Sequence, residues 1–361
     1  MSKNLQQTRN ISPAARAEMF AQMTRQHLQP MAPVAGAEGA RVSFTLPKSR
    51  LLTRTMLEVT ATLNAIHASN TAYTPAAFAP YSFIQQVRVE TNTGFTPVRL
   101  SGRSLYLMNL LSHQAQAFTP VYVGTSRGRA VQGVVAASGG GANNVVRFML
   151  DLGAVLNDRD PAGMVLLQNE ETVVTVHIDF GTVADLAPAA AGFTFAVSNI
   201  AVAPLVETFS IPQVREAFPD LSILKLVQEQ TQPIAGAGAL EVKLPTGTTY
   251  RKLCFFITNA AGAGITDAGL NGDIELIFNQ ADTPYRLRPT QLAAINAKHY
   301  GQPLPNGFYA FDFSAHMGLP NYSGARDYVD TERLTECWLR INPAAAGNIT
   351  VMYEILSQLR G

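Results

Sequence analysis

The sequence has 361 residues, enough for two or three domains of about 150 residues each. Its 27 basic and 26 acidic residues give a net charge of +1, and charged residues make up 15% of the chain, against about a quarter in typical proteins. This composition excludes a disordered chain, a collagen and a protein that relies on a strong overall charge to bind its partner. Hydrophobic content is ordinary at 47%, so the scarcity of charge indicates that much of the surface contacts other protein.

The first 40 residues have the composition of a helical arm followed by a linker. Ser12 and Pro13 are typical of a helix start, because Ser caps free N–H groups and Pro costs nothing at the first helical position. Helix-forming residues continue from Ala14 to Leu28, and residues 31–40 are rich in Ala, Gly and Pro. We therefore predict an arm that is not a core element.

The arm is also basic and partly apolar. Through Pro30 it holds four basic residues against Glu18 alone, a local net charge of +3. A basic amphipathic helix of this kind can lie on an anionic membrane, or it can pack under a neighbouring protein. Both interpretations remain open, and they are compatible. The residues expected on this surface are Arg16, Met19, Phe20, Met23 and Arg25.

From Arg41 onward, short runs of β-branched and aromatic residues alternate with clusters of Gly, Pro, Asn and Asp, which is typical of a sandwich or barrel. The charge-free stretch 186–206 is about long enough to span a bilayer, but it is interrupted by Pro and Gly and its apolar residues alternate. We predict a pair of strands there and a short helix at 103–113. The other predicted strands are 42–46, 56–63, 83–91, 145–152 and 172–180.

The second half of the chain repeats the order of the first. The alternating strand that ends in Leu46-Pro47 recurs 198 residues later, ending in Leu244-Pro245. The motif Thr-Pro-Val-Arg-Leu at 96–100 recurs 187 residues later as Thr-Pro-Tyr-Arg-Leu, again before a short helix. In the same register, Leu105, Met108 and Asn109 match Leu292, Ile295 and Asn296. A tandem duplication explains this order better than two unrelated all-β domains do.

Each copy has about eight strand-length runs and a short helix, which fits a jelly roll of two four-stranded sheets. We predict an all-β protein: two tandem eight-stranded jelly-roll sandwiches with short flanking helices and an N-terminal helical arm. A Gly-rich excursion at 117–144 should project from the end of the first sandwich. The predicted units are 1–40 for the arm and linker, 41–206 for the first jelly roll, 207–238 for a crossover with a strand near 224–229, and 239–361 for the second jelly roll.

This organisation resembles the double jelly-roll major capsid proteins of tailless, membrane-containing icosahedral phages, the tectivirus type in particular. The resemblance covers nearly the whole chain and rests on the order of the elements: the Gln/Ala/Met-rich arm at 5–28, the strand at 83–91, the helix with Leu-Tyr-Leu-Met-Asn at 105–109, the Gly-rich excursion and a second copy of the same plan. The second copy is short, which leaves limited room for a tall outward loop.

The resemblance implies a structural protein without catalytic activity or cofactor, located in the virion and assembled in the host cytoplasm. Its homotrimers would form pseudo-hexameric capsomers of an icosahedral shell. The implied partners are further copies of the chain, vertex and minor capsid proteins, and an internal lipid membrane beneath the shell, but no specific nucleic acid.

Two alternatives stay open. One is a secreted carbohydrate-active or lectin-like double jelly-roll protein, and the other is a minor vertex or spike protein of the same virus type. A single Trp and the absence of an apolar signal segment near the N-terminus argue against the first.

Patterns for catalysis or metal binding are weak. No P-loop, zinc-protease or nucleophile-elbow motif occurs, and His177, which alternates with valines, is expected to be a hydrogen-bonded strand residue. A loop with Asp151, Asp158 and Asp160 could bind Ca²⁺, although a turn with internal Arg–Asp pairing is favoured. Cys254 and Cys337 are the only cysteines, and we expect buried free thiols on what could be neighbouring strands of one sheet.

Overall fold

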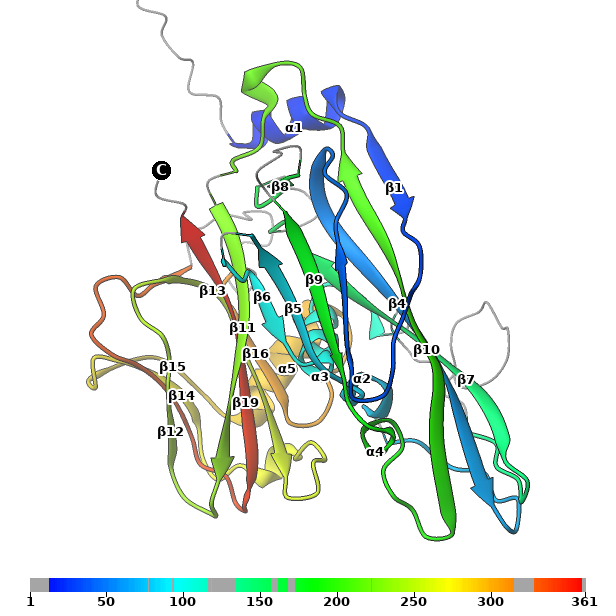
Figure 1. Ribbon diagram of the computed structural model, residues 1–361. Coiled ribbons are helices and arrows are strands. Elements are labelled where there is room, and N and C mark those ends of the chain that lie inside the picture. The colour runs from blue at the N-terminus through cyan, green and yellow to red at the C-terminus, as the bar shows by residue number, and fades with distance from the viewer. Residues whose placement is uncertain are drawn as a thin grey trace, which may run out of the picture.

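The computed structural model contains two β-sandwiches side by side, with their strands running along the same long direction (Figure 1). The residues that the structure describes are 13–76, 78–92, 94–115, 118, 134–156, 162–167, 173–221, 223–314 and 328–358.

The first sandwich consists of two facing sheets. Sheet 1 has the strand order β1-β10-β4-β7, with β2 added on β10 and β8 on β4, and sheet 2 has the order β3-β9-β5-β6. The strands are β1 (Gln26–Pro30), β2 (Val34–Ala35), β3 (Arg41–Thr45), β4 (Leu51–His67), β5 (Ile84–Thr91), β6 (Val98–Leu100), β7 (Ala142–Gly153), β8 (Val165–Leu166), β9 (Val174–Phe180) and β10 (Phe193–Phe209).

The second sandwich has the same plan. Sheet 3 has the order β11-β19-β13-β16, with β17 added on β13, and sheet 4 has the order β12-β18-β14-β15. The strands are β11 (Ile223–Ile234), β12 (Leu240–Lys243), β13 (Thr249–Asn259), β14 (Ile274–Phe278), β15 (Asp282–Leu287), β16 (Phe308–Asp312), β17 (Val329–Asp330), β18 (Cys337–Ile341) and β19 (Gly347–Gln358).

Alternating side chains build the core of the first sandwich. In β4, Leu57, Val59 and Leu63 are fully buried between the sheets, while the intervening Glu58 and Thr60 are half-buried on the outer face. A period of two places successive side chains on opposite faces of a strand, so this sequence buries one face of sheet 1. Burial of each such aliphatic side chain contributes about 1.5–3 kcal/mol.

The helices are short and lie outside the sheets. They are α1 (Pro13–Met23), α2 (Ala79–Ser82), α3 (Gly102–Asn109), α4 (Val183–Leu186) and α5 (Pro289–Tyr300). Helix α3 confirms the first predicted short helix, and α5 confirms its repeat. Within the described part of the chain, no helix has the length and apolar character needed to cross a membrane.

The two sandwiches correspond element by element, which confirms the expected duplication. Sheet 1, in the order β1-β10-β4-β7, corresponds to sheet 3, in the order β11-β19-β13-β16. Sheet 2, in the order β3-β9-β5-β6, corresponds to sheet 4, in the order β12-β18-β14-β15. Even the short added strand recurs, since β8 pairs with β4 as β17 pairs with β13.

An asparagine makes the same contact in both copies. The Asn109 side chain on α3 donates to the backbone carbonyl of Asp151 (2.8 Å) and accepts from its N–H (2.9 Å). On α5, Asn296 donates to the carbonyl of Ala310 (2.8 Å) and accepts from its N–H (3.0 Å). Both asparagines are buried, so each one satisfies backbone groups that would otherwise lack a partner. The contact fixes each helix to its strand, β7 or β16.

Two expectations for the arm and linker are wrong in detail. The first helix ends at Met23, not Leu28, because residues 26–30 form β1 and pair with β10 from Gln26–Phe209 to Pro30–Leu205. The expected linker contains β2, which also pairs with β10. Tertiary hydrogen bonding at the edge of sheet 1 overrides the helix propensity of the sequence. The strand expected in the crossover is present as β11.

The stretch 186–206 does not form a pair of strands. It contains the end of α4 and most of one strand, β10, which pairs with β4 along almost its whole length. The Asn199 backbone has a positive φ of 50°, but it produces a shift of register between Ser198 and Ala201 instead of a turn. Most of the excursion at 117–144 lies outside the described residues.

The asparagine contacts generate a prediction about stability. Asn109→Ala or Asn296→Ala leaves a buried backbone N–H and carbonyl unpaired, so we expect each to lower the free energy of unfolding by about 1–3 kcal/mol. Urea unfolding of purified protein measures the change. Asn143→Ala, which removes an exposed contact with Asn64, is the control and should cost less than about 0.5 kcal/mol. Equal effects at all three positions would contradict the assigned role.

Candidate functional site

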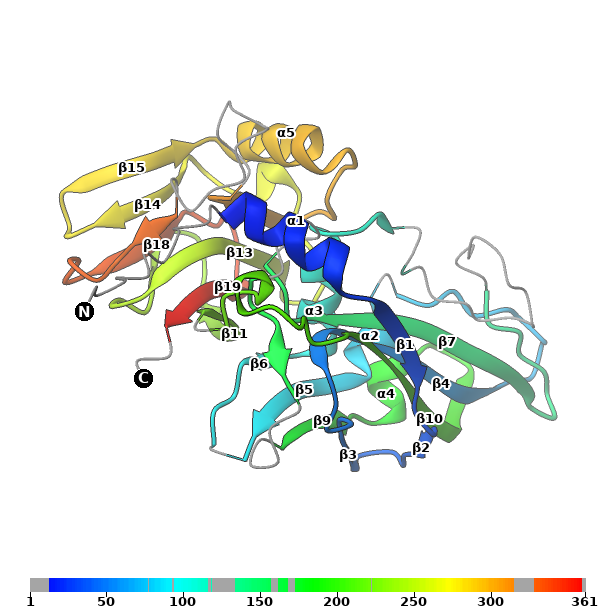
Figure 2. The ribbon, with the colours of Figure 1, turned by 90° about the horizontal axis from the view of Figure 1, so that it is seen from above.

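The junction between the two sandwiches is the most unusual region of the molecule. Strands β6 and β11 pair in parallel through Val98–Val227 and Arg99–Gln228, so that sheets 2 and 3 form one continuous sheet. Figure 2 shows that sheet 3 also faces α3 of the first sandwich. Sheet 3 is therefore covered on both sides, and nine successive residues of β13, 250–258, are buried.

Aromatic and amide side chains fill the contact beside α3. The Phe256 ring on β13 lies under the Arg103 guanidinium, 5.2 Å from the ring centre, and 5.4 Å from the ring of Phe78. The Gln302 side chain, which follows α5, donates to the carbonyls of Leu110 and His113 (2.9 and 3.0 Å). These contacts fix the second sandwich to the loop that follows α3 as well as to the helix itself.

Two buried ion pairs stand on the face of sheet 3 that meets the first sandwich. Arg251 on β13 donates to Glu354 on β19, and the Lys252 Nζ lies 3.5 Å from an Asp312 carboxylate oxygen on β16. The Tyr300 hydroxyl at the end of α5 donates to the same Asp312 oxygen (2.8 Å). Because buried charges are costly unless they are paired, these contacts restrict how the strands and α5 can be arranged.

The environment lowers the pKa of both buried carboxyls. Burial alone would raise the pKa of Glu354, but the positive charges of Arg251, Lys225 and Lys252 outweigh it and lower the pKa below its usual range. For Asp312, burial is likewise outweighed, by Lys252 and by hydrogen bonds from Ser314 and Tyr300, and its pKa is lowered. Burial lowers the pKa of the Lys225 ammonium, which donates to the Val155 carbonyl (3.2 Å).

The first sandwich contributes its own charged groups to the junction. Asp151 on β7 accepts from the His113 ring (3.0 Å) and lies 3.6 Å from the Arg54 guanidinium on β4. Its second carboxylate oxygen is buried and has no hydrogen-bond partner among the described residues. A cavity of about 90 Å³ is lined by these three side chains together with those of Lys225, Arg251, Lys252 and Glu354. The arrangement can hold two sandwiches in one relative orientation, and this is the function that its chemistry favours.

Sequence reasoning did not identify these buried charges as a group. The available signal was the presence of charged residues within strongly apolar strands: Arg-Lys at 251–252, Asp312 between two phenylalanines, and Glu354 after Tyr353. The sequence alone did not show that all of them point at the other sandwich.

The structure brings the predicted arm residues together only in part. Phe20 is 4% exposed and packs on the Phe209 ring, 5.5 Å between centres, so it is not available on the surface as expected. Arg16 and Met19 are half-buried, whereas Met23 is 46% exposed and Arg25 is exposed. The backbone N–H of Arg25 donates to the Ser210 hydroxyl (2.9 Å), which ties the end of the arm to the segment after β10.

The proposed Ca²⁺ loop and His177 are the remaining candidates from the sequence. Asp158 and Asp160 lie outside the described residues, and no group of three or more possible metal ligands occurs among the described His, Cys, Asp and Glu side chains. His177 shares a hydrogen bond with the Ser43 hydroxyl on β3 (2.7 Å), as expected of a strand histidine.

The expectation of buried free thiols is confirmed, but the two cysteines do not lie on neighbouring strands of one sheet. Cys254 lies in β13 of sheet 3, and Cys337 lies in β18 of the opposite sheet 4. Cys254 packs with the core of the first sandwich and Cys337 with that of the second, so they belong to different apolar clusters. Both thiols are free and buried, and burial raises the pKa of Cys337 to about 12 and that of Cys254 further.

Known structures share this arrangement over nearly the whole chain. A chain of the Sulfolobus Turreted Icosahedral Virus structure matches with a TM-score of 0.69 and 15% identity, covering 92% of this chain and 91% of that chain. The major capsid protein P2 of bacteriophage PM2 matches with a TM-score of 0.56 and 13% identity, covering 93% and 98%. A chain of the PBCV-1 virus capsid matches with a TM-score of 0.60 and 12% identity, covering 92% and 94%.

The fold is a double jelly roll. The prediction of two tandem eight-stranded jelly rolls from the sequence is confirmed. No protein-family model matches the sequence, and no curated protein matches it.

The buried pairs of the double jelly roll generate a prediction about acid sensitivity. The folded-state pKa values of Glu354 and Asp312 lie below their unfolded values, so their stabilisation is present above about pH 4 and is lost as the pH falls below it. At neutral pH, Glu354→Gln leaves the buried Arg251 without its carboxylate partner, although its Nε still donates to the Tyr328 hydroxyl, and it should lower the free energy of unfolding by about 3–5 kcal/mol. It should also weaken the pH dependence, which denaturant unfolding between pH 3 and 7 measures.

Glu241→Gln is the matched control, because Glu241 pairs with Arg340 on the exposed surface. Such a pair contributes less than about 1 kcal/mol. An acid-unfolding curve that Glu354→Gln leaves unchanged would rule out the role assigned to this carboxyl.

Proposed function

We propose that the chain is the major shell subunit of an icosahedral virus particle and acts by self-assembly without catalysis. The main support is the likeness in fold to chains of virus particles across more than 90% of each compared chain. The junction adds support, because its buried ion pairs hold the two sandwiches in one relative orientation.

The duplication suits a shell subunit for a geometric reason. Two similar sandwiches side by side, repeated by a threefold axis, give six similar blocks from three chains, and such a tile is nearly hexagonal. Homo-oligomers with closed cyclic symmetry are common, and the low charge content suits interfaces whose centres are depleted in charged residues. The proposed assembly is therefore a homotrimer that contacts neighbouring trimers.

We divide the chain into a helical arm that ends at Met23, a first jelly roll at 26–209 and a second at 223–358, a proposal that follows the strand pairing. The proposed location is the virion. The proposed partners are further copies of the chain, with vertex and minor capsid proteins of the same particle.

The arm is proposed to face an internal lipid membrane. Helix α1 covers one end of the first sandwich, the same end at which β19 terminates (Figure 1). Phe20 anchors the helix, which leaves Met23 and Arg25 exposed beside the half-buried Arg16. Basic residues near an anionic lipid surface each contribute about 1 kcal/mol.

The shell-subunit proposal predicts the mass of the protein in solution. Native mass spectrometry at micromolar concentration should give about three times the chain mass of 38.9 kDa. A stable monomer would contradict the proposal. In purified particles the chain should be the most abundant protein, whereas a minor vertex or spike protein would be present in far fewer copies.

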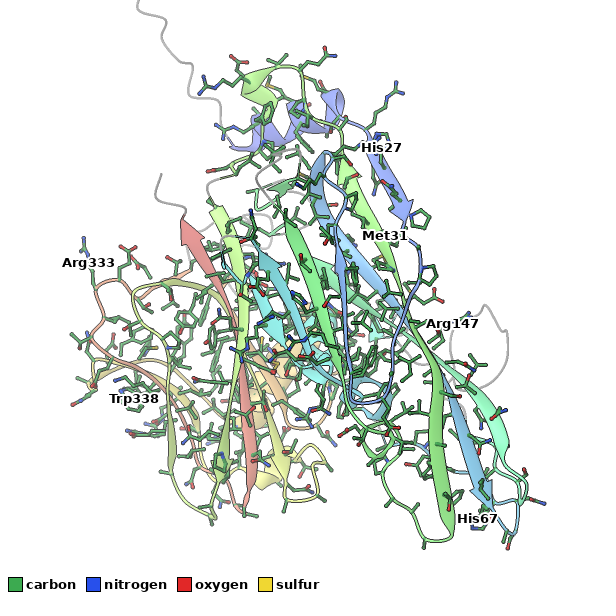
Figure 3. All side chains as sticks on the ribbon, viewed as in Figure 1. His27, Met31, His67, Arg147, Arg333 and Trp338 are labelled. Carbon is green, nitrogen blue, oxygen red and sulfur yellow. The ribbon has the colours of Figure 1, made fainter. Side chains whose placement is uncertain are left out.

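The arm proposal predicts binding to anionic vesicles. The full-length protein should float with phosphatidylserine-rich vesicles and not with neutral ones. The double variant Arg16→Glu, Arg25→Glu should bind at least about tenfold more weakly, because two attractive charges become repulsive. The control reverses two charges on the second sandwich, Lys243→Glu and Arg333→Glu; Arg333 lies far from α1 (Figure 3). An equal loss in both variants, or no binding by the wild type, would exclude this role.

A further inference from the structure

Only one of two equivalent junctions is closed within a single chain. Sheet 3 of the second sandwich packs on α3 and β6 of the first. The counterpart of sheet 3 is sheet 1, and the counterparts of α3 and β6 are α5 and β15. Among the described residues, β1 at the edge of sheet 1 and the exposed side of α5 have no such partner, whereas Arg54 and Asp151, toward β7, line the closed junction.

The two asparagine contacts show which residues of β4 in the first sandwich correspond to which residues of β13 in the second. Asp151 and Ala310, the residues that the two asparagines hold, lie opposite Met56 in β4 and Cys254 in β13. Arg54 and Lys252, two residues earlier in these strands, therefore occupy equivalent positions.

The same match extends across the next two strands. Arg54 pairs with Glu207 in β10, and Lys252 pairs with Glu354 in β19. Glu207 in turn lies opposite Leu28 in β1, and Glu354 lies opposite Val227 in β11. Leu28 is therefore the structural counterpart of Val227.

The residues that the closed junction buries have counterparts that are exposed to solvent, as expected if those counterparts belong to an interface that is still open. Val227 is 6% exposed and lines the junction cavity together with Met108 of α3, which is 8% exposed. Leu28 is 60% exposed, and Ile295, the counterpart of Met108 on α5, is 37% exposed. Leu28 and Ile295 are thus two large apolar side chains in contact with solvent at the positions where the closed junction buries Val227 and Met108.

The backbone edges are open in the same way. Strand β6 pairs with β11, but among the described strands its counterpart β15 pairs only with β14, and β1 pairs only with β10. Unpaired edges of this kind readily accept another strand. Figure 2 shows β1 and β15 on different sides of the molecule, so they are not placed to pair within one chain.

We propose that the β1 edge of one copy pairs in parallel with the β15 edge of the next copy, with Leu28 packed against Ile295 of α5. The register follows from the closed junction: Leu28 lies opposite Tyr285, and Gln29 lies opposite Arg286, as Val227 and Gln228 lie opposite Val98 and Arg99. The partner is a second copy of this chain, because only such a copy presents both matching surfaces. This inference rests on the proposed self-assembly and specifies the surfaces that carry it.

The contact joins different surfaces of the two copies, so repeating it either closes a ring or extends without limit. Each chain already contains one junction of this type. A ring of six sandwiches therefore needs three such contacts between three chains.

A disulfide test addresses the register directly. Directly opposed residues of neighbouring strands lie about 4.8 Å apart, within the range that a disulfide bridges. The variant Gln29→Cys, Arg286→Cys should form covalent dimers and trimers on mild oxidation, seen by non-reducing electrophoresis. Both positions are exposed, and Arg286 contributes only surface ion pairs with Asp273 and Glu275. Cys254 and Cys337 are buried with raised pKa values and should not compete.

The two single-cysteine variants are the matched controls and should remain monomeric on the same gel, because each cysteine faces a different residue. A wild-type trimer whose double variant does not crosslink overturns this inference and leaves the proposed function intact. A monomeric wild-type protein overturns both. Crosslinks that form equally in a single-cysteine variant also contradict the inference, since they indicate contact between identical surfaces.

A second measurement does not depend on oxidation. Leu28→Asp and Ile295→Asp should each raise the dissociation constant of the trimer at least about tenfold, because a charge is then buried at the centre of the contact. Val214→Asp alters an exposed valine in the segment between β10 and β11 and should leave the trimer unchanged. Trimers that tolerate both Leu28→Asp and Ile295→Asp would exclude these surfaces.

Discussion

The burial of sheet 3 on both faces is the constraint on which the rest of the structure depends. An ordinary sandwich buries one face of each sheet, and its strands alternate between apolar and polar residues. Sheet 3 faces its own core on one side and α3 on the other, so β13 is buried over nine successive residues. Any polar group on the second face must then be paired, which explains why Arg251, Lys252, Asp312 and Glu354 occur together as ion pairs.

The same constraint explains how two copies of one plan differ in sequence. Glu58 on β4 is exposed enough to pair with Arg147 at the surface, whereas its counterpart on β13 is Phe256, which is buried beneath Arg103. The fold tolerates both solutions because the core-facing side of each strand is unaffected. A duplicated domain therefore acquires a junction by changing one face of one sheet, while the asparagine contacts keep each helix in place.

The junction and the exposed edges together give a coherent account of assembly. A chain that already contains one rigid contact between two sandwiches presents both halves of a similar contact at its two sides. Formation of the second contact would bury Leu28, whose exposure is otherwise unfavourable, and would satisfy two open strand edges. Helix α1 lies across one end of the first sandwich and leads directly into the β1 edge, so the arm can contact a different surface while β1 contacts the next copy (Figure 1).

The sequence by itself determined the number of sandwiches, the short helices, and the register of the repeat between Thr96–Leu100 and the matching segment before α5, because alternation and turn residues are local signals. Only the tertiary structure decided that residues 26–30 form a strand, that β10 is one strand and not two, and that the two cysteines lie in opposite sheets. It also decided which charges are buried at the junction. These outcomes depend on hydrogen bonds and packing between strands that are far apart in the sequence, and no local pattern encodes which distant strand will supply them.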